Sequence, residues 1–214
     1  MIGELFSRLP RPKDNPRNAP VVTAISTVVF ILGVVLAFWL GFQRLEPDLR
    51  IEQRITLSAS PRVRFDPSSE SWQHVVAADP ESGQGPQYAS LAAKGENVCA
   101  FTWQVGAVVR GTIDLDRFDN DADATVEVMR VGGLQSQPAG STEVDIDAEH
   151  TAAELLYFPQ GYQDGVYTAT AARVFAGSGD YVLLTLLCAK QEDVSLEGMS
   201  EVLTDVMVRI FPVS

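Results

Sequence analysis

The chain has 214 residues with 16 basic and 28 acidic side chains, so its net charge is −12, and 46% of its residues are hydrophobic. This composition is ordinary for a globular protein. Its acidic balance argues against proteins that bind nucleic acid or an anionic lipid surface, because both kinds of binding need basic patches.

Residues 20–42 are a run of 23 residues without an ionisable side chain. As a helix rising about 1.5 Å per residue, the run would measure roughly 35 Å, enough to cross a hydrocarbon core of about 30 Å. No small-x-small cleavage motif follows it, which distinguishes it from a secretory signal peptide. We therefore expect an uncleaved single-pass transmembrane helix over residues 20–42. Residues 1–19 precede it as a tail that either frays or docks as a short amphipathic turn.

The charge and the cysteines of the remaining chain set the expected orientation. Residues 1–42 hold 4 basic and 2 acidic side chains, which leaves 12 basic and 26 acidic ones, a net charge of −14, for residues 43–214. Cys99 and Cys188 both lie in this part, and an even number of cysteines suits an oxidising compartment. We expect a cytoplasmic tail, a span in the plasma membrane and an extracytoplasmic domain.

Small residues recur on one face of the predicted span. Gly33, Ala37 and Gly41 follow one another at steps of four, and Ser26 lies near the same face two turns earlier. Glycine and alanine are common in membrane helices in general, so the pattern has a plain explanation. Small side chains also let two helix backbones approach closely, and close packing is what drives helix association in lipid. We expect these four residues to form a helix-packing surface.

Residues 43–87 read as a stalk and loop segment. The stretch "LRIEQRITL", residues 49–57, alternates apolar and polar side chains, which favours a strand or an extended stalk. Residues 60–86 are rich in serine, proline, glycine and aspartate and are typical of loops.

Residues 88–214 are expected to form one folded α+β domain, with an antiparallel sheet packed by helices; a β-sandwich is the alternative. The sequence predicts strands by period-two alternation and turn residues, and the stretch 151–158 fits a helix or a strand equally well. A closing helix is predicted over residues 195–211, where apolar residues recur at steps of three and four. The predicted strands cover residues 98–105, 107–115, 124–131, 141–147, 165–175 and 180–190.

Three segments give this domain a resemblance to a known family. The expected strands "ATVEVMRVGG" and "DYVLLTLLCAK", followed by the expected helix "MSEVLTDVMVRIF", resemble the PsbP-like α+β domain in their order. The resemblance covers residues 88–212 and concerns a pattern, not a diagnostic motif. It implies an antiparallel sheet closed by a strand and a helix. It also implies a non-catalytic role in assembly, which is common in that family.

The two cysteines are predicted to form a disulfide, with two buried free thiols as the alternative. Closing a loop of about 90 residues would stabilise the fold by on the order of 4 kcal/mol. Zinc binding is disfavoured, because His74 and His150 are distant in sequence from Cys99 and Cys188, whereas structural zinc sites bring ligands in close pairs. Neither histidine accompanies a nucleophile motif, so we expect no enzyme activity, catalytic residue, metal or cofactor.

Five aspartates gather in the stretch "DLDRFDNDADATVE". From Asp119 the spacing mimics the opening of an EF-hand calcium loop, but Ala124 and Arg130 occupy positions where that loop needs glycine and glutamate. We therefore expect a solvated acidic turn rather than a calcium site. The five residues are Asp114, Asp116, Asp119, Asp121 and Asp123.

Together these features predict a membrane-anchored accessory subunit. The tail "RLPRPKDNPRNAP", the span ending "AFWLGFQR" and the acidic domain resemble the layout of small one-helix subunits of bacterial cytochrome bcc–aa3 respiratory supercomplexes. The resemblance implies an integral membrane complex as partner, besides the lipid bilayer, and a role in electron transport. The alternative is a tethered extracytoplasmic module that binds a small ligand or calcium.

Overall fold

The computed structural model describes residues 31–32, 49–67, 72–79, 81, 83–90, 99–146 and 151–213. The chain divides into two compact units, Met1–Pro47 and Asp48–Ser214. Apart from residues 31 and 32, the predicted span 20–42 lies outside the described residues, and so do all four small residues of its packing face, Ser26, Gly33, Ala37 and Gly41. Within the described part of the chain, no helix is both long and apolar enough to cross a membrane.

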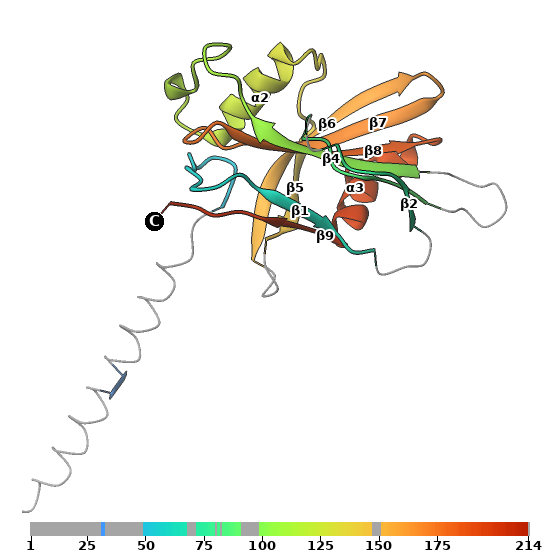
Figure 1. Cartoon of the computed structure of the whole chain (residues 1–214), viewed down its shortest axis with the longest axis horizontal. Helices are drawn as coiled ribbons and strands as arrows, with labels where there is room; N and C mark the ends of the chain where they lie inside the picture. Colours follow the sequence, from blue (N-terminus) through green and yellow to red (C-terminus); the bar gives the residue numbers. More distant parts are fainter. Residues whose placement is uncertain are drawn as a thin grey trace, which may run out of the picture. The chain divides into compact units, whose positions relative to one another are not determined.

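The second unit is built on one curled sheet of nine strands in the order β1-β9-β5-β6-β7-β8-β4-β3-β2 (Figure 1). Neighbouring strands are antiparallel, except that β5 and β9 run parallel. The strands are β1 (Arg62–Phe65), β2 (Trp72–Val76), β3 (Gln87–Ser90), β4 (Cys99–Ala107), β5 (Gly140–Asp145), β6 (Ala152–Gln163), β7 (Val166–Val174), β8 (Asp180–Cys188) and β9 (Val206–Arg209).

Two α-helices of the described chain pack on opposite faces of the sheet. Helix α2 (Asp121–Val131) packs on β7 through Ala124 and Val174, whereas α3 (Leu196–Leu203) contributes Met199 to the main core, which also holds Ala171 of β7. Side chains alternate along a strand, so Val174 and Ala171 face opposite sides. Two short 3₁₀ helices, η2 (Leu115–Arg117) and η3 (Glu192–Val194), precede the α-helices. The expected α+β class is confirmed in this outline, and a β-sandwich is not formed, because the nine strands belong to one sheet.

The predicted strand over residues 124–131 was wrong, because this segment lies in α2. Its β-branched valines and threonine favour a strand, but the start of the segment carries a helix cap. The Asn120 side chain accepts a hydrogen bond from the Asp123 backbone N–H at 2.7 Å, which satisfies a donor that the first turn leaves free. The predicted strand 107–115 was also wrong, since β4 ends at Ala107 and a turn through Gly111 (φ 87°) follows.

The single closing helix over residues 195–211 was wrong in its second half. Helix α3 ends at Leu203, and β9 follows after two residues and pairs with β1 and β5. Residues 206–209 fit both the helical period and the period of two that is typical of strands. In the structure Val206 and Val208 are buried and Arg209 is exposed, which is the alternation of a strand. The order helix then strand also departs from the PsbP-like pattern, as does the helix over 121–131.

The remaining strand predictions are confirmed at β4, β5, β7 and β8, and the ambiguous stretch 151–158 belongs to strand β6. The turns between them lie where turn residues predicted them. Asp164 (φ 52°) and Gly165 (φ 93°) connect β6 to β7, and Gly179 (φ 81°) lies in the turn between β7 and β8. These φ values fall in the left-handed region, which favours glycine, asparagine and aspartate.

Residues 49–90 contribute core side chains as well as strands β1 to β3. The stretch 49–57 contains no regular strand, but its apolar face is buried as the alternation predicts: Leu49, Ile51, Ile55 and Leu57 are each at most 8% exposed. Phe65 of β1 contacts the rings of Trp72, Tyr88 and Phe101 at centroid distances of 5.5, 4.9 and 4.9 Å. The segment assigned to a stalk and loop therefore takes part in the folded unit.

Phe65→Ala tests whether this segment supports the whole unit. We expect the free energy of unfolding to fall by about 3–5 kcal/mol, because a buried aromatic ring is lost and its cavity collapses only in part. Urea unfolding followed by tryptophan fluorescence measures the loss. Val109→Ala is the control, because Val109 is 73% exposed and its truncation should change little. Equal stability of the two variants would show that β1 packs independently of the core.

Candidate functional site

A fully buried ion pair joins helix α2 to the centre of the sheet. Arg173 on β7 and Asp121, the first residue of α2, both have 0% exposed side chains. The Arg173 Nε and Nη2 atoms donate to Asp121 Oδ2 at 3.0 and 2.9 Å. Burying charges is costly, and a pair of this kind persists when its remaining donors and acceptors are also satisfied.

Backbone groups supply those remaining partners. Arg173 Nη1 donates to the carbonyl oxygens of Leu49 and Glu154, and Nη2 donates to that of Arg50 at 3.1 Å. A guanidinium has five N–H donors, so each one has an acceptor here. On the other side, Asp121 Oδ1 accepts from the backbone N–H groups of Ile55 at 3.2 Å and Ala176 at 2.9 Å.

The result is a clamp on residues 49–55, which we call the Arg173 clamp and define as Arg173, Asp121 and Glu154. Besides the bonds above, the Ile51 N–H donates to Glu154 Oε2 at 3.0 Å. The N–H groups of Asp121 and Ala122 donate to the carbonyl oxygens of Gln53 and Ile51 at 3.1 and 2.9 Å. The segment that directly follows the predicted span and its short connection is therefore fixed by its backbone to α2, β6 and β7.

Two kinds of effect shift the pKa of Asp121 in opposite directions. Burial raises the pKa of the Asp121 carboxyl, and the Arg173 charge together with the N–H groups of Ala176 and Ile55 works against that shift. Removing one partner of such a pair leaves the other charge buried and uncompensated. The pair is therefore sensitive to the loss of either member.

The clamp corrects the prediction of a solvated acidic turn. Asp121 belongs to the aspartate cluster yet is buried, and both its oxygens are occupied by Arg173 and backbone N–H groups. Asp114 accepts from the Asp116 N–H, and Asp116, whose side chain is 92% exposed, pairs with Arg54 at 2.8 Å. A signal for the clamp was present in the sequence: Arg173 is the one charged side chain of the segment that forms β7, and charged residues are rarely fully buried unless paired.

A second site lies where β4 begins and β8 ends. Cys99 and Cys188 are directly opposite each other in the register of these antiparallel strands, and they form a disulfide with an S–S distance of 2.08 Å. The predicted disulfide is confirmed. Cys188 is 0% exposed, whereas Cys99 is partly exposed and lines a cavity of about 630 Å³.

The lining of this cavity, which we call the disulfide cavity, combines apolar and acidic side chains. Trp72, Leu186 and Val202 supply the apolar part. Among the described residues that line it, every ionisable side chain is acidic. These side chains are Glu192, Asp193, Glu197, Glu201 and Asp205.

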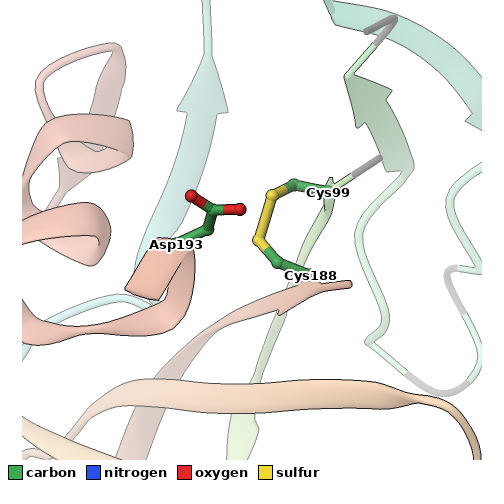
Figure 2. A group of neighbouring side chains, drawn as sticks. All are labelled: Cys99, Cys188 and Asp193. Atoms are coloured by element: carbon green, nitrogen blue, oxygen red, sulfur yellow. A yellow bond between two sulfur atoms is a disulfide. The ribbon is translucent and has the colours of Figure 1, made fainter. Parts of the chain in front are cut away.

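Asp193 lies next to the two sulfur atoms of the disulfide. Figure 2 shows its carboxylate directed toward the two sulfur atoms, and a carboxylate oxygen and both Sγ atoms lie within 4.8 Å of one another. Asp193 Oδ2 is buried and has no hydrogen-bond partner in the described part of the chain. In the disulfide form the sulfur atoms are not thiolates, so they cannot serve as metal ligands.

Close packing holds Asp193 in this position. The Tyr157 hydroxyl donates to the Val194 carbonyl oxygen, which fixes η3 against the sheet. Helix α3 approaches η3 so closely that a Cβ atom at Gly198 would lie 2.3 Å from the Asp193 carbonyl oxygen. This contact explains the glycine inside a short helix, where glycine is otherwise unfavourable.

The histidines weighed as metal ligands are not part of either site. His74 lies on β2 with an exposed side chain, and its ring contacts Tyr88 at a centroid distance of 5.5 Å. His150 lies outside the described residues.

Comparisons with known proteins leave the family open. No family model matches the chain, and no curated protein matches it. Among solved structures, LpqN of Mycobacterium tuberculosis, described as involved in cell envelope biogenesis, is similar with a TM-score of 0.36 and 12% identity. The match covers 71% of this chain and 86% of LpqN. A likeness at this TM-score assigns neither a fold nor a function to this chain.

Arg173→Met tests the clamp by urea unfolding. We expect the free energy of unfolding to fall by about 3–5 kcal/mol, because the Asp121 carboxylate stays buried without its partner. The double variant Arg173→Met with Asp121→Leu should recover part of that loss. Arg54→Met is the control, since its pair with the exposed Asp116 should contribute at most about 1 kcal/mol. Strictly additive losses in the double variant would contradict the coupling.

The acidic lining should control the reduction of the disulfide by charged thiols. We expect the cationic thiol cysteamine to reduce it faster than the anionic thiol 2-mercaptoethanesulfonate, because the carboxylates attract one reagent and repel the other. Alkylation of freed cysteines, read by mass spectrometry at low salt, gives both rates. Glu197→Gln with Glu201→Gln should lower the ratio of the rates, and Asp116→Asn, outside the cavity lining, should not. A ratio unaffected by the paired substitution would rule out this role of the lining.

Proposed function

We propose that the protein is a non-catalytic accessory subunit, anchored in the plasma membrane, whose extracytoplasmic domain docks against a larger integral membrane complex. The observation that carries the proposal is the Arg173 clamp, which binds residues 49–55 into the domain. A flexible tether would leave the first residues after a span free to extend. Here Leu49, Ile51 and Ile55 are buried in the domain.

The short connection between the predicted span and the domain supports this proposal. The predicted span ends at residue 42 and the clamp begins at Leu49, so only residues 43–48 connect the two. Fully extended, this connection reaches at most about 25 Å. A domain on so short a connection stays at the membrane surface, where it can bind the exposed part of a neighbouring membrane protein. A long flexible linker would serve a distant partner better.

Charge and redox state support the outer location and a protein partner. The disulfide suits an oxidising, extracytoplasmic compartment. With a net charge of −14, residues 43–214 are repelled by anionic headgroups, so contact at the membrane surface is expected with protein rather than with lipid.

We further propose that the partner is a respiratory supercomplex of the cytochrome bcc–aa3 type. Its support is the layout of tail, span and acidic domain, together with the small residues Gly33, Ala37 and Gly41 as a contact face for another transmembrane helix.

A second candidate function is capture of a small cationic ligand outside the cell. The disulfide cavity favours it, because about 630 Å³ of concave surface carries five carboxylates beside apolar walls. Calcium binding at the aspartate cluster is less favoured, since both oxygens of Asp121 are engaged in the clamp.

Co-purification tests the proposed function. After mild detergent extraction we expect the tagged protein to carry integral membrane partners in fixed stoichiometry. Gly33→Leu with Gly41→Leu should release those partners while the protein remains in the membrane fraction, because larger side chains prevent close helix approach. Val35→Leu, on another face of the predicted helix, is the matched control. Purification of the protein alone would defeat the proposal, and unchanged partners in the glycine variant would defeat the role of the packing face.

A further inference from the structure

We propose that the reduced form of the chain binds one divalent cation of the zinc class at Cys99, Cys188 and Asp193. The disulfide and the bound cation would be alternative states of one site. This site does not depend on a contact with a membrane complex. It follows from the geometry of the disulfide cavity.

The three ligand groups lie close to one another. Cys99 Sγ, Cys188 Sγ and a carboxylate oxygen of Asp193 are all within 4.8 Å of one another. Zinc binds thiolate sulfur at about 2.3 Å and carboxylate oxygen at about 2.0–2.2 Å, so a tetrahedral site separates two sulfur ligands by about 3.8 Å. After reduction the two sulfur atoms are no longer bonded, and side-chain rotation at these facing positions can separate them to that distance.

Three separate elements hold these ligands. Cys99 begins β4, Cys188 ends the neighbouring strand β8, and Asp193 lies in η3 (Figure 2). The Tyr157 hydroxyl fixes η3 through the Val194 carbonyl oxygen. Rigid placement lowers the cost of organising a metal site.

Asp193 provides an independent sign of a missing partner. Its Oδ2 atom is buried without a hydrogen bond in the described part of the chain, and a buried polar atom of this kind is costly unless something satisfies it. A cation bound between the Asp193 carboxylate and the two sulfur atoms would give this carboxylate a partner.

The disulfide cavity supplies access and a favourable potential. Its four further carboxylates, Glu192, Glu197, Glu201 and Asp205, raise the local concentration of cations. The two sulfurs and Asp193 leave a fourth coordination position open to this cavity, where water or another ligand can bind. Two thiolates with one carboxylate suit Zn²⁺ better than the hard cations Ca²⁺ and Mg²⁺, which prefer oxygen alone.

The chemistry of the switch balances with a dithiol as the reductant. The dithiol gives two electrons to the Cys99–Cys188 bond and becomes a cyclic disulfide, while the protein gains two thiols. The cation then displaces the two thiol protons and binds the thiolates. In the reverse direction, exchange with an oxidised dithiol removes two electrons, re-forms the bond and releases the cation. A chain that is still reduced when it reaches an oxidising compartment would therefore keep its two thiolates bound to the cation until the disulfide forms.

Cobalt titration of the full chain in detergent tests the proposal. The chain is reduced with a phosphine, freed of reductant without oxygen and titrated with Co²⁺. We expect one equivalent to bind with the visible bands of tetrahedral Co²⁺ and a thiolate charge-transfer band, and Zn²⁺ to bleach both. Bound cation should also raise the urea midpoint of the reduced chain, because it binds the folded state alone.

Three variants make the test specific. Cys99→Ser should abolish the charge-transfer spectrum of the paired thiolates. Asp193→Asn keeps both cysteines, so its fold can be verified in the oxidised form, and it should weaken binding at least about tenfold and change the spectrum. Glu197→Gln removes one charge from the same cavity and should leave the spectrum unchanged.

Two outcomes would overturn the proposal. Equal binding of Co²⁺ to the oxidised chain would place the cation on surface carboxylates. A spectrum and affinity unchanged by Asp193→Asn would show that the cysteine pair binds metal without the third ligand.

Discussion

The buried pair of Arg173 and Asp121 is the constraint on which this structure depends. A guanidinium in the centre of a sheet is tolerated only if each of its donors finds an acceptor, and the acceptors here come from the start of α2, from β6 and from residues 49 and 50. Satisfying one side chain therefore brings three distant parts of the chain to one point. It also connects the two faces of the sheet, since Asp121 opens the helix on one face and Leu49 belongs to the core on the other.

This constraint also explains where sequence reasoning succeeded and where it could not. The strands β7 and β8 were predictable, because alternation and turn residues agree over their full length, and with only two cysteines the disulfide partner was unique. The segment 124–131 was read as a strand from its β-branched residues. Its helical state depends on the Asn120 cap and on the contact of Asp121 with a residue 52 positions away, which no local period reports. Residues 206–209 fit both periods, and pairing with β1 decides between them.

The two sites differ in how their charges are paired. In the Arg173 clamp, Arg173 and Asp121 neutralise each other, Glu154 accepts a hydrogen bond from a backbone N–H, and residues 49–55 are held by their own backbone groups. Around the disulfide cavity, carboxylates from residues 192–205 meet Trp72, far apart in sequence, so the cavity could not be foreseen from spacing. The Arg173 clamp holds residues 49–55 within the domain, and the disulfide cavity places carboxylates beside the Cys99–Cys188 disulfide.

The position of β9 has a consequence for the order in which the unit can form. In the sheet, β9 lies between β1 and β5, so the first strand of the unit has the last one as its neighbour. Contacts between segments so distant along the chain close slowly, because the intervening loop must lose its entropy before the pairing is gained. If the chain is threaded across a membrane from its N-terminal anchor, β1 emerges early and waits without a partner until nearly the whole domain has followed. The sheet could then be completed only after nearly the whole domain has been translocated.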